Sequence, residues 1–478
     1  MADVKVWVPD KKLVWKVASV LGDVGKDIVL TSHDGGSTRI PVPKSSTHPV
    51  DPSHLLIPVD VCDIKNIHDA PLLDILRKRF QQDIFYTNAS DFLISFNPYK
   101  SIPPKIPLEY IHLSDDHDAD ETPPHAFTLA NAALSSLIRN SEPDFRENHH
   151  DPQSLLINQS VIVSGESGSG KTEASKLIID FLIAANIAMN ARDGDDSVGV
   201  DFGLIGKQIR NILLNSTIVY ESIGNAKTIR NDNSSRFGKH FKLEYTEDNT
   251  LLAAYTETFL LEQARLVSVG QGERNYHVFY RLVQGSPKIQ PDLATSLRLS
   301  SVENFNILTE GGCTLISTER EDEERFHALV DALRVLEVSE AELEHLWSLL
   351  AAILHIGNLA FSAGESDSEP AAVEAPPEGL AVEQLAAILG INKEDFIRCL
   401  TMQKVSTSSR ASVNAKYLSH QTARNNAFSM IKWLYRSMFS WIVRKINSVF
   451  GAVAIRYMLL IQLLKARINA FTEFRLVC

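Results

Sequence analysis

The sequence predicts an α/β protein, in which a small β-rich domain precedes a larger part with helices packed on a sheet. Three observations favour this class. Residues 1–45 alternate apolar and polar residues between Gly and Asp turns, as short strands do. From "PLLDILRKRF" onward, helical and strand patterns alternate, which is typical of helices packed on a sheet. Around residues 160–176, an apolar run, a glycine-rich turn and a helical pattern follow one another.

Composition and charge exclude several classes of protein. The chain has 478 residues, 44% hydrophobic and 22% charged, which is enough material for a large core. Its net charge of -12 at pH 7 argues against bulk nucleic-acid binding. Four distant cysteines without CxxC spacing indicate reduced thiols in a cytosolic protein. The N-terminus has no apolar signal region, and the apolar run "MLLIQLLKARI" is too short for a membrane span.

The expected elements divide the chain into three parts. Residues 1–45 form a small β-barrel or sandwich, and "THPVDPSHLLIPVD" links it to the α/β part, residues 46–450. Residues 451–478 form a separate tail. Within the α/β part, "LEVSEAELEHLWSLLAAILHIGNLAF" has a broad apolar face at helical spacing, so we expect a largely buried helix. His355 within it is expected to be a core histidine with a backbone partner, not a ligand.

The strongest motif is a phosphate-binding loop. "GESGSGKT" matches G-x-x-x-x-G-K-[ST] in full, between a predicted strand and a predicted helix. Glycines let backbone N–H groups converge on a phosphate, and the N-terminus of the helix favours an anion. A chance glycine turn is the alternative, but the context favours a nucleoside triphosphate with Mg²⁺. The expected contacts are Gly165, Glu166, Ser167, Gly168, Ser169, Gly170, Lys171, which reaches the β/γ-phosphates, and Thr172, whose hydroxyl binds Mg²⁺.

A second constellation, "NDNSSR", follows at residues 231–236. Phosphoryl transfer needs donors around the γ-phosphate, a second hydroxyl for the metal and a fixed positive charge. Asn231, Ser234, Ser235 and Arg236 supply those groups. Read alone, an Asn- and Ser-rich stretch indicates a surface loop. Its occurrence after a phosphate loop favours the catalytic interpretation.

Together these motifs resemble the myosin motor domain. "QSVIVSGESGSGKTEASK" is similar to its P-loop and "NAKTIRNDNSSRFGK" to its switch I. "DFLISFNPYKSIP", "TETFLLEQARLVSVGQGERNYHVFYRLV" and "LYRSMFSWIVRKIN" resemble further segments of the family in the same order, over nearly all of residues 1–450. The resemblance implies a P-loop NTPase core, with a mixed central sheet flanked by helices, preceded by a small SH3-like β-barrel. It also implies an ATP-binding, actin-based motor ATPase of the cytoplasm and cytoskeleton.

The resemblance also implies roles for the site residues. Lys171 would contact the β/γ-phosphates of ATP, and Thr172 and Ser235 would coordinate Mg²⁺. Ser234 would lie beside the γ-phosphate and the attacking water, and Asn231 would help to close the pocket. Arg236 would pair with a glutamate of switch II. The adenine-contacting segment would begin at Asn97, Pro98 and Tyr99, although Lys105 replaces the tyrosine that the family has eight residues after the asparagine.

The resemblance ends near residue 450. The family expects a "DIFGFE"-like switch II after "INSVF", whereas this sequence reads "GAVAIRYMLLIQLLKARINAFTEFRLVC". Arg236 is therefore expected to lack a carboxylate partner. Filamentous actin is the expected partner, light chains are not expected, and we expect this chain alone not to turn over ATP at the rate of a motor. The alternatives are a nucleotide-binding module without motor activity and, less consistent with "NDNSSRFGK", a P-loop kinase or GTPase.

One regulatory site is also expected from the resemblance. The family has an actin-contacting loop shortly before the "LYRSMFSWIV" helix, with an acidic or phosphorylatable residue in it. Here the loop reads "VSTSSRASVNAKYLSHQ". Spacing places Ser412 at this position, with Ser409 as the alternative. An ordinary serine-rich loop would have the same composition.

Overall fold

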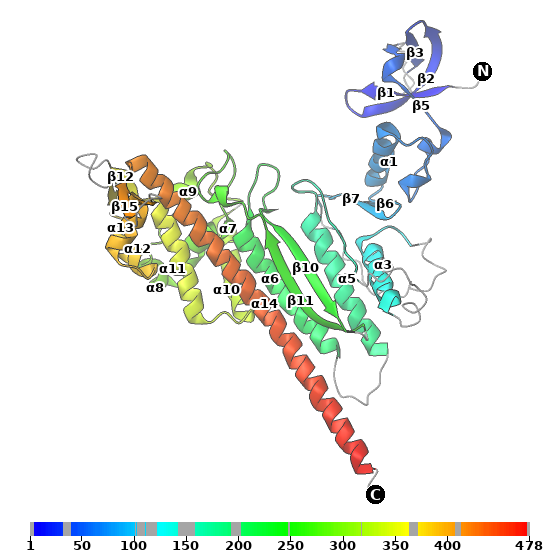
Figure 1. Cartoon of the computed structure of the whole chain (residues 1–478). Coiled ribbons are helices and arrows are strands. Elements are labelled where there is room, and N and C mark those ends of the chain that lie inside the picture. The colour runs from blue at the N-terminus through cyan, green and yellow to red at the C-terminus, as the bar shows by residue number, and fades with distance from the viewer. Residues whose placement is uncertain are drawn as a thin grey trace. The chain divides into compact units, whose positions relative to one another are not determined.

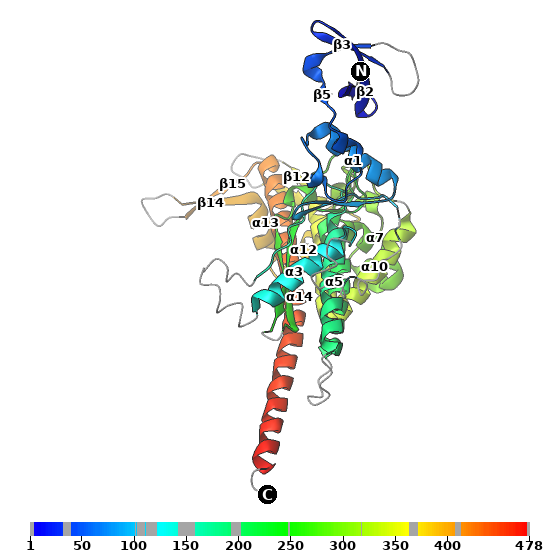
Figure 2. The same cartoon turned by 90° about the vertical axis from the view of Figure 1, so that its right-hand side faces the viewer.

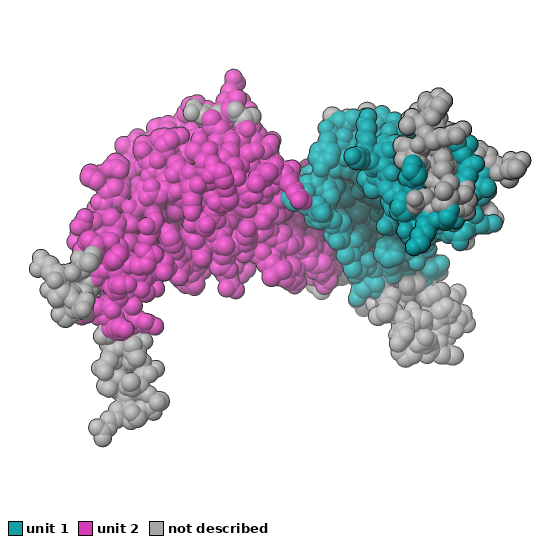
Figure 3. Space-filling view, turned by 90° about the horizontal axis from the view of Figure 1, so that it is seen from above, with its two compact units in different colours: residues 1–188 teal, residues 189–478 magenta. Residues whose placement is uncertain are grey.

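The computed structural model describes residues 4–31, 40–100, 102, 110, 122–141, 158–192, 202–246, 249–316, 318–362, 371–406 and 413–475. The chain forms two compact units, Met1–Ala188 and Met189–Cys478, which Figure 3 colours separately. Both units contain helices and sheets, so the α/β class is confirmed.

An antiparallel sheet of five strands begins unit 1. Their order in the sheet is β4-β3-β2-β1-β5, and their bounds are Lys5–Asp10 (β1), Val14–Val24 (β2), Asp27–Thr31 (β3), Ile40–Pro43 (β4) and His48–Pro49 (β5). Asp10 fixes the β1–β2 turn, because its Oδ1 accepts from the backbone N–H groups of Lys12 and Leu13 at 2.8 Å each. Trp7 is fully buried. The expected short strands are confirmed, and β5 carries the sheet beyond residue 45.

Helices and one hairpin are the regular elements among the other described residues of unit 1. A buried arginine ties the first helix to the hairpin: Arg79 Nε donates to Thr87 Oγ1 at 2.8 Å, and Arg79 Nη2 donates to the Tyr86 carbonyl at 2.9 Å. The last helix follows the glycine-rich loop directly and runs past the end of the unit. The bounds are Asp69–Gln81 (α1), Tyr86–Ala89 (β6), Phe92–Ser95 (β7), Ala126–Ser141 (α3) and Lys171–Arg192 (α5).

Unit 2 is built around one hairpin and several long helices. The β10–β11 hairpin packs against α6 and α14, as Figure 1 shows. A further hairpin, β14–β15, projects from the helices of this unit in Figure 2. The main elements are Phe202–Gly224 (α6), Asn225–Ala226 (β8), Ser234–Ser235 (β9), Gly238–Tyr245 (β10), Leu251–Phe259 (β11), His277–Ile289 (α7), Pro291–Ser296 (α8), Glu319–Val335 (α10), Glu340–Gly357 (α11), Ala360–Ser362 (β12), Ala372–Glu374 (β13), Val382–Ile388 (α12), Lys393–Thr401 (α13), Met402–Ser406 (β14), Val413–Tyr417 (β15) and His420–Arg475 (α14).

Helix α11 lies in the core of unit 2, as its broad apolar face predicted. It begins at a capping box: the Ser339 side chain accepts from the Glu342 N–H, and the Glu342 side chain accepts from the Ser339 N–H. His355 is 3% exposed, its Nε2 lies 2.9 Å from the Leu297 carbonyl, and its Nδ1 accepts from the Leu380 N–H. The prediction of a core histidine with a backbone partner is confirmed.

Helix α14 continues without a break across residue 450, where the sequence resemblance ended. Its middle part packs against β11, and Asn447 pairs with the backbone of Thr256: the Thr256 N–H donates to Asn447 Oδ1 at 2.9 Å, and Asn447 Nδ2 donates to the Thr256 carbonyl at 2.8 Å. Beyond residue 456 the helix extends past the other elements of unit 2 in Figures 1 and 2. Residues His420–Arg456 are long and apolar enough to cross a membrane by length and composition alone, a test that core helices of soluble proteins also pass.

One expected strand does not form. The residues before the glycine-rich loop, "SVIV", have no regular secondary structure, and Ile162 is 90% exposed. A strand needs a neighbour for its N–H and C=O groups, and the described residues provide no ladder partner for this segment. Every ladder between described strands is antiparallel, so the expected mixed central sheet is not formed by the part of the chain that the structure describes.

Candidate functional site

The first candidate segment, in unit 1, consists of the glycine-rich loop and the start of α5. Gly168 and Gly170 have φ values of 81° and 93°, which residues with a Cβ rarely adopt. The loop therefore turns within a few residues and leads directly into α5 at Lys171. Lys171 Nζ donates to the carbonyls of Gly165 at 2.7 Å and Glu166 at 2.8 Å, so the ammonium group folds back over the loop. Thr172 is the second residue of the helix.

A segment some seventy residues earlier contacts this loop. Asn97 Nδ2 donates to the Gly168 carbonyl at 2.7 Å, and the Tyr99 hydroxyl donates to the same oxygen at 3.2 Å. Asn97 Oδ1 accepts from the Tyr99 N–H at 3.0 Å. The structure thus brings two of the three residues expected at an adenine site onto the phosphate loop itself.

A second candidate segment, residues 225–236, lies in unit 2 and contains a tight loop between two short strands. β8 and β9 pair antiparallel, with Ala226 opposite Ser234. Within the loop between β8 and β9, the Thr228 N–H donates to the Asn231 carbonyl at 2.8 Å, and the Asn231 N–H donates to the Thr228 carbonyl at 3.3 Å. The Thr228 hydroxyl also bonds to the Asn231 backbone. Asn231 Oδ1 accepts from the Asn233 N–H at 3.0 Å. The Asn231 side chain therefore stabilises the turn.

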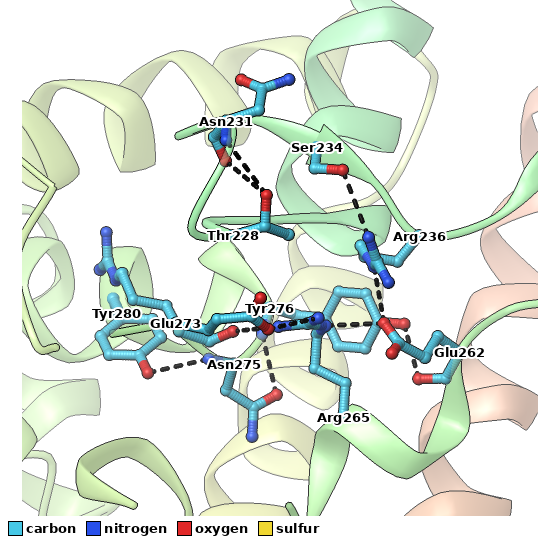
Figure 4. A network of polar contacts seen from close by, with 11 residues as sticks. Thr228, Asn231, Ser234, Arg236, Glu262, Arg265, Glu273, Asn275, Tyr276 and Tyr280 are labelled. Atoms are coloured by element: carbon cyan, nitrogen blue, oxygen red, sulfur yellow. Dashed lines mark hydrogen bonds and ion pairs between the residues drawn. The ribbon is translucent and has the colours of Figure 1, made fainter. Parts of the chain in front are cut away.

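Arg236 lies in an ion-pair network next to the loop between β8 and β9 (Figure 4). Its Nη1 contacts Ser234 Oγ at 3.3 Å, and its Nε donates to Glu262 Oε2 at 2.6 Å. Ser234 is 4% exposed, whereas Ser235 is exposed. The expectation that Arg236 lacks a carboxylate partner is wrong. Glu262 lies just beyond the end of β11, and the Glu262 N–H also donates to the Arg236 carbonyl at 3.0 Å, so the backbone holds the two side chains together.

The network continues into the core of unit 2. Arg265 Nε donates to the same Glu262 Oε2 at 2.7 Å, and its Nη2 donates to Glu273 Oε2 at 2.8 Å. The Arg265 side chain is only 5% exposed. The Tyr276 hydroxyl donates to the Glu262 carbonyl at 2.9 Å. Two carboxylates thus balance two guanidinium groups, so the network carries no net charge.

The charges of this network shift the acidity of its central carboxylate. Burial alone would raise the pKa of Glu262, but the hydrogen bonds from Arg236 and Arg265, with their positive charges, outweigh it and hold the pKa below its ordinary value. Glu262 is therefore ionised at neutral pH. Burial, followed by the charge of Glu262, raises the pKa of the nearby Tyr276, which stays a neutral donor.

Sequence reasoning missed Glu262, Arg265 and Glu273. The signal was present in "LLEQARLVSVGQGE", where an acid precedes an arginine by three residues after an apolar strand. The phosphate loop belongs to unit 1 and Ser235 to unit 2, and a shared Mg²⁺ at Thr172 and Ser235 stays a prediction. Lys105 and Ser412 lie outside the described residues.

Comparisons with known proteins agree with the sequence motifs. Residues 59–475 match the family model described as myosin head (motor domain). The chain is 30% identical over 442 residues to Myosin-3 of Arabidopsis thaliana, an alignment that covers 92% of this chain and 34% of that protein. It is 32% identical over 393 residues to Myosin-51 of Schizosaccharomyces pombe, covering 82% and 24%, and 30% identical over 450 residues to unconventional myosin-Va of Homo sapiens, covering 93% and 22%. The chain thus spans about a third or less of these curated relatives.

Proposed function

Because the chain belongs to the myosin head (motor domain) family, we propose that it binds ATP with Mg²⁺ and is part of an actin-based motor ATPase. The observation that carries this proposal is the phosphate loop at the start of α5, with Lys171 held against the carbonyls of Gly165 and Glu166. A loop of this shape can direct its N–H groups at a phosphate, and the start of a long helix adds positive potential.

The donor set of the chain suits a magnesium nucleotide. Hydroxyl oxygens are ligands that Mg²⁺ accepts, and we assign Thr172 and Ser235 to this role. When bound, the metal would neutralise charge on the β- and γ-phosphate oxygens. Lys171 would supply a point charge to the same oxygens, and Gly165, Glu166, Ser167, Gly168, Ser169 and Gly170 would surround them.

The switch I-like residues would orient groups around the γ-phosphate. The Ser234 hydroxyl would exchange a hydrogen bond with the attacking water. Asn231 would stabilise the turn that precedes Ser234. Arg236 would add a fixed positive charge, and its bond to Glu262 restricts its guanidinium to one direction. Arg265, which also pairs with Glu273, donates a second hydrogen bond to the same Glu262 oxygen.

The remaining assignments extend the family relationship to the whole protein. We propose filamentous actin as the partner, a cytoplasmic, cytoskeletal location, and no light chain, nucleic acid or membrane span for these residues. We also propose that residues 1–45 belong to an SH3-like barrel, that residues 46–450 belong to the motor domain with a P-loop NTPase core, and that residues 451–478 are a tail of divergent sequence.

A lysine substitution tests the nucleotide site. Lys171→Ala removes the ammonium group from the loop, so binding of a non-hydrolysable ATP analogue with Mg²⁺ should be abolished in calorimetry. Lys176→Ala is the matched control, because Lys176 is in the same helix and forms a surface pair with Glu173 at 2.9 Å. An unchanged affinity of the Lys171→Ala protein would contradict the assignment.

A second measurement separates the motor from a nucleotide-binding module without motor activity. Steady-state ATPase activity of residues 1–478 is compared with and without filamentous actin. Strong activation by actin would favour the motor interpretation for these residues themselves. Nucleotide binding without activation would favour the module.

A further inference from the structure

We propose that Asn97 and Tyr99 are positioning residues that hold the phosphate loop in its binding shape by fixing the Gly168 carbonyl. This inference rests on the proposed nucleotide-binding function and assigns these two residues to the phosphates instead of the base. The donors come from the segment that follows β7, and the acceptor lies in the loop before α5; both belong to unit 1.

The hydrogen bonds converge on one oxygen. A peptide carbonyl has two lone pairs, and the Asn97 amide and the Tyr99 hydroxyl donate to Gly168 O at 2.7 and 3.2 Å. The amide itself cannot rotate freely, because its Oδ1 accepts from the Tyr99 N–H at 3.0 Å. The three bonds therefore fix both donors and saturate the acceptor.

This carbonyl belongs to a peptide whose orientation the backbone alone does not fix. Gly168 has a φ of 81° and no Cβ, so the peptide that follows it can rotate at low cost. A rotated peptide would direct its carbonyl oxygen toward the phosphates, where it would repel them instead of leaving N–H groups to bind them. Two donors on the oxygen disfavour that rotation before any ligand arrives.

The backbone conformation of Tyr99 is consistent with a role in holding the loop. Its φ is 51°, a left-handed conformation that is uncommon for a residue with a Cβ and that costs free energy. The conformation places the Tyr99 N–H on Asn97 Oδ1 and the hydroxyl on Gly168. The residue as a whole is 76% exposed, so burial of the side chain does not explain the conformation.

The test uses a ligand without a base. Tyr99→Phe removes one hydrogen bond and keeps the ring, and Asn97→Leu replaces the amide by a side chain of similar shape. Affinities for Mg²⁺-pyrophosphate and Mg²⁺-ATP are measured by calorimetry on the full chain. We expect Tyr99→Phe to weaken both ligands by the same factor, about fivefold for one hydrogen bond, and Asn97→Leu to weaken both by about tenfold.

Tyr86→Phe is the matched control, because the Tyr86 hydroxyl bonds to Ser95 and the same atom is removed. It should leave both affinities unchanged. Weakened binding of ATP with unchanged binding of pyrophosphate would overturn the inference in favour of a purine contact. Unchanged binding of both ligands would overturn it as well.

Hydrogen exchange of the ligand-free chain tests the same contact without any nucleotide. Amides in residues 165–171 should exchange faster in Tyr99→Phe and Asn97→Leu than in the wild type, while those of α1 should not change. Equal exchange rates would overturn the inference. A wild-type chain that binds neither ligand would instead contradict the proposed function, and the exchange result would still decide whether the two residues hold the loop.

Discussion

Replacing Glu262 by glutamine should destabilise unit 2, because this carboxylate joins two guanidinium groups. The substitution keeps the shape of the side chain and one acceptor oxygen but removes the negative charge. Arg236 and Arg265 both donate to Glu262 Oε2, at 2.6 and 2.7 Å. Arg265 also has its bond to Glu273, whereas the other side-chain contact of Arg236 is the longer one to Ser234.

The magnitude follows from these contacts. Hydrogen bonds to charged groups contribute roughly 1.5–3 kcal/mol each, and the glutamine oxygen would restore part of that contribution. The side chain of Glu262 is 34% exposed, so water compensates for a further part. We expect a loss of about 2 kcal/mol in the free energy of unfolding. For a unit of this size, such a loss lowers the thermal midpoint by about 4 °C.

The assay is thermal unfolding followed by circular dichroism, with Glu340→Gln as the matched control. Glu340 forms a pair with Arg334 at 2.7 Å, but both side chains are about half exposed or more, so the control should change the midpoint by less than about 1 °C. Equal midpoints for the wild type and Glu262→Gln, or an equally large drop in the control, would refute the reasoning.

The same carboxylate predicts a pH dependence. The folded pKa of Glu262 lies below its ordinary value of 4.5, so the folded state releases this proton more readily than the unfolded state does. Its contribution is complete above about pH 4.5 and is lost as the pH falls through the folded pKa. Glu262→Gln should therefore lose less stability than the wild type on acidification in this range.

Three further predictions concern other parts of the chain. Asn447→Leu removes both bonds to the backbone of Thr256, which is 1% exposed, and should lower the free energy of unfolding by about 2–4 kcal/mol. The loss is measured as a lower thermal midpoint, and an unchanged midpoint would contradict the pairing. Burial, followed by the charges of Arg281 and Arg274, holds the pKa of His277 well below 6.5. The stability of the fold should therefore fall as the pH drops below about 6.5, and His277→Gln should reduce that fall when stability is measured by urea unfolding. If His277→Gln has the same pH profile as the wild type, another group titrates there. In a preparation that shows actin-activated turnover, Ser412→Ala and Ser412→Glu should change that turnover differently, and equal turnover would end the regulatory hypothesis.

Local features could be predicted from the sequence, and features made by distant contacts could not. The capping box and apolar face of α11 and the turn of the phosphate loop depend on neighbouring residues, so the pattern determines them. The segment "SVIV" is apolar enough for a strand, but strand formation depends on partners elsewhere in the chain. The pairing of Arg236 with Glu262 links residues 26 positions apart, and only the folded backbone, through the bond from the Glu262 N–H to the Arg236 carbonyl, makes their approach evident.

The position of Lys171 has a consequence for how the loop could receive an anion. An ammonium group has three N–H bonds in tetrahedral directions, and two of them are directed at the carbonyls of Gly165 and Glu166. Those two bonds leave a single N–H with a defined direction, so a phosphate oxygen could be added as a third acceptor while the first two are kept. Much of the conformational entropy of a flexible side chain is then lost before binding and not during it. A guanidinium group has all its donors in one plane and could not use this tripod, so arginine would be a poor substitute for Lys171 despite its equal charge.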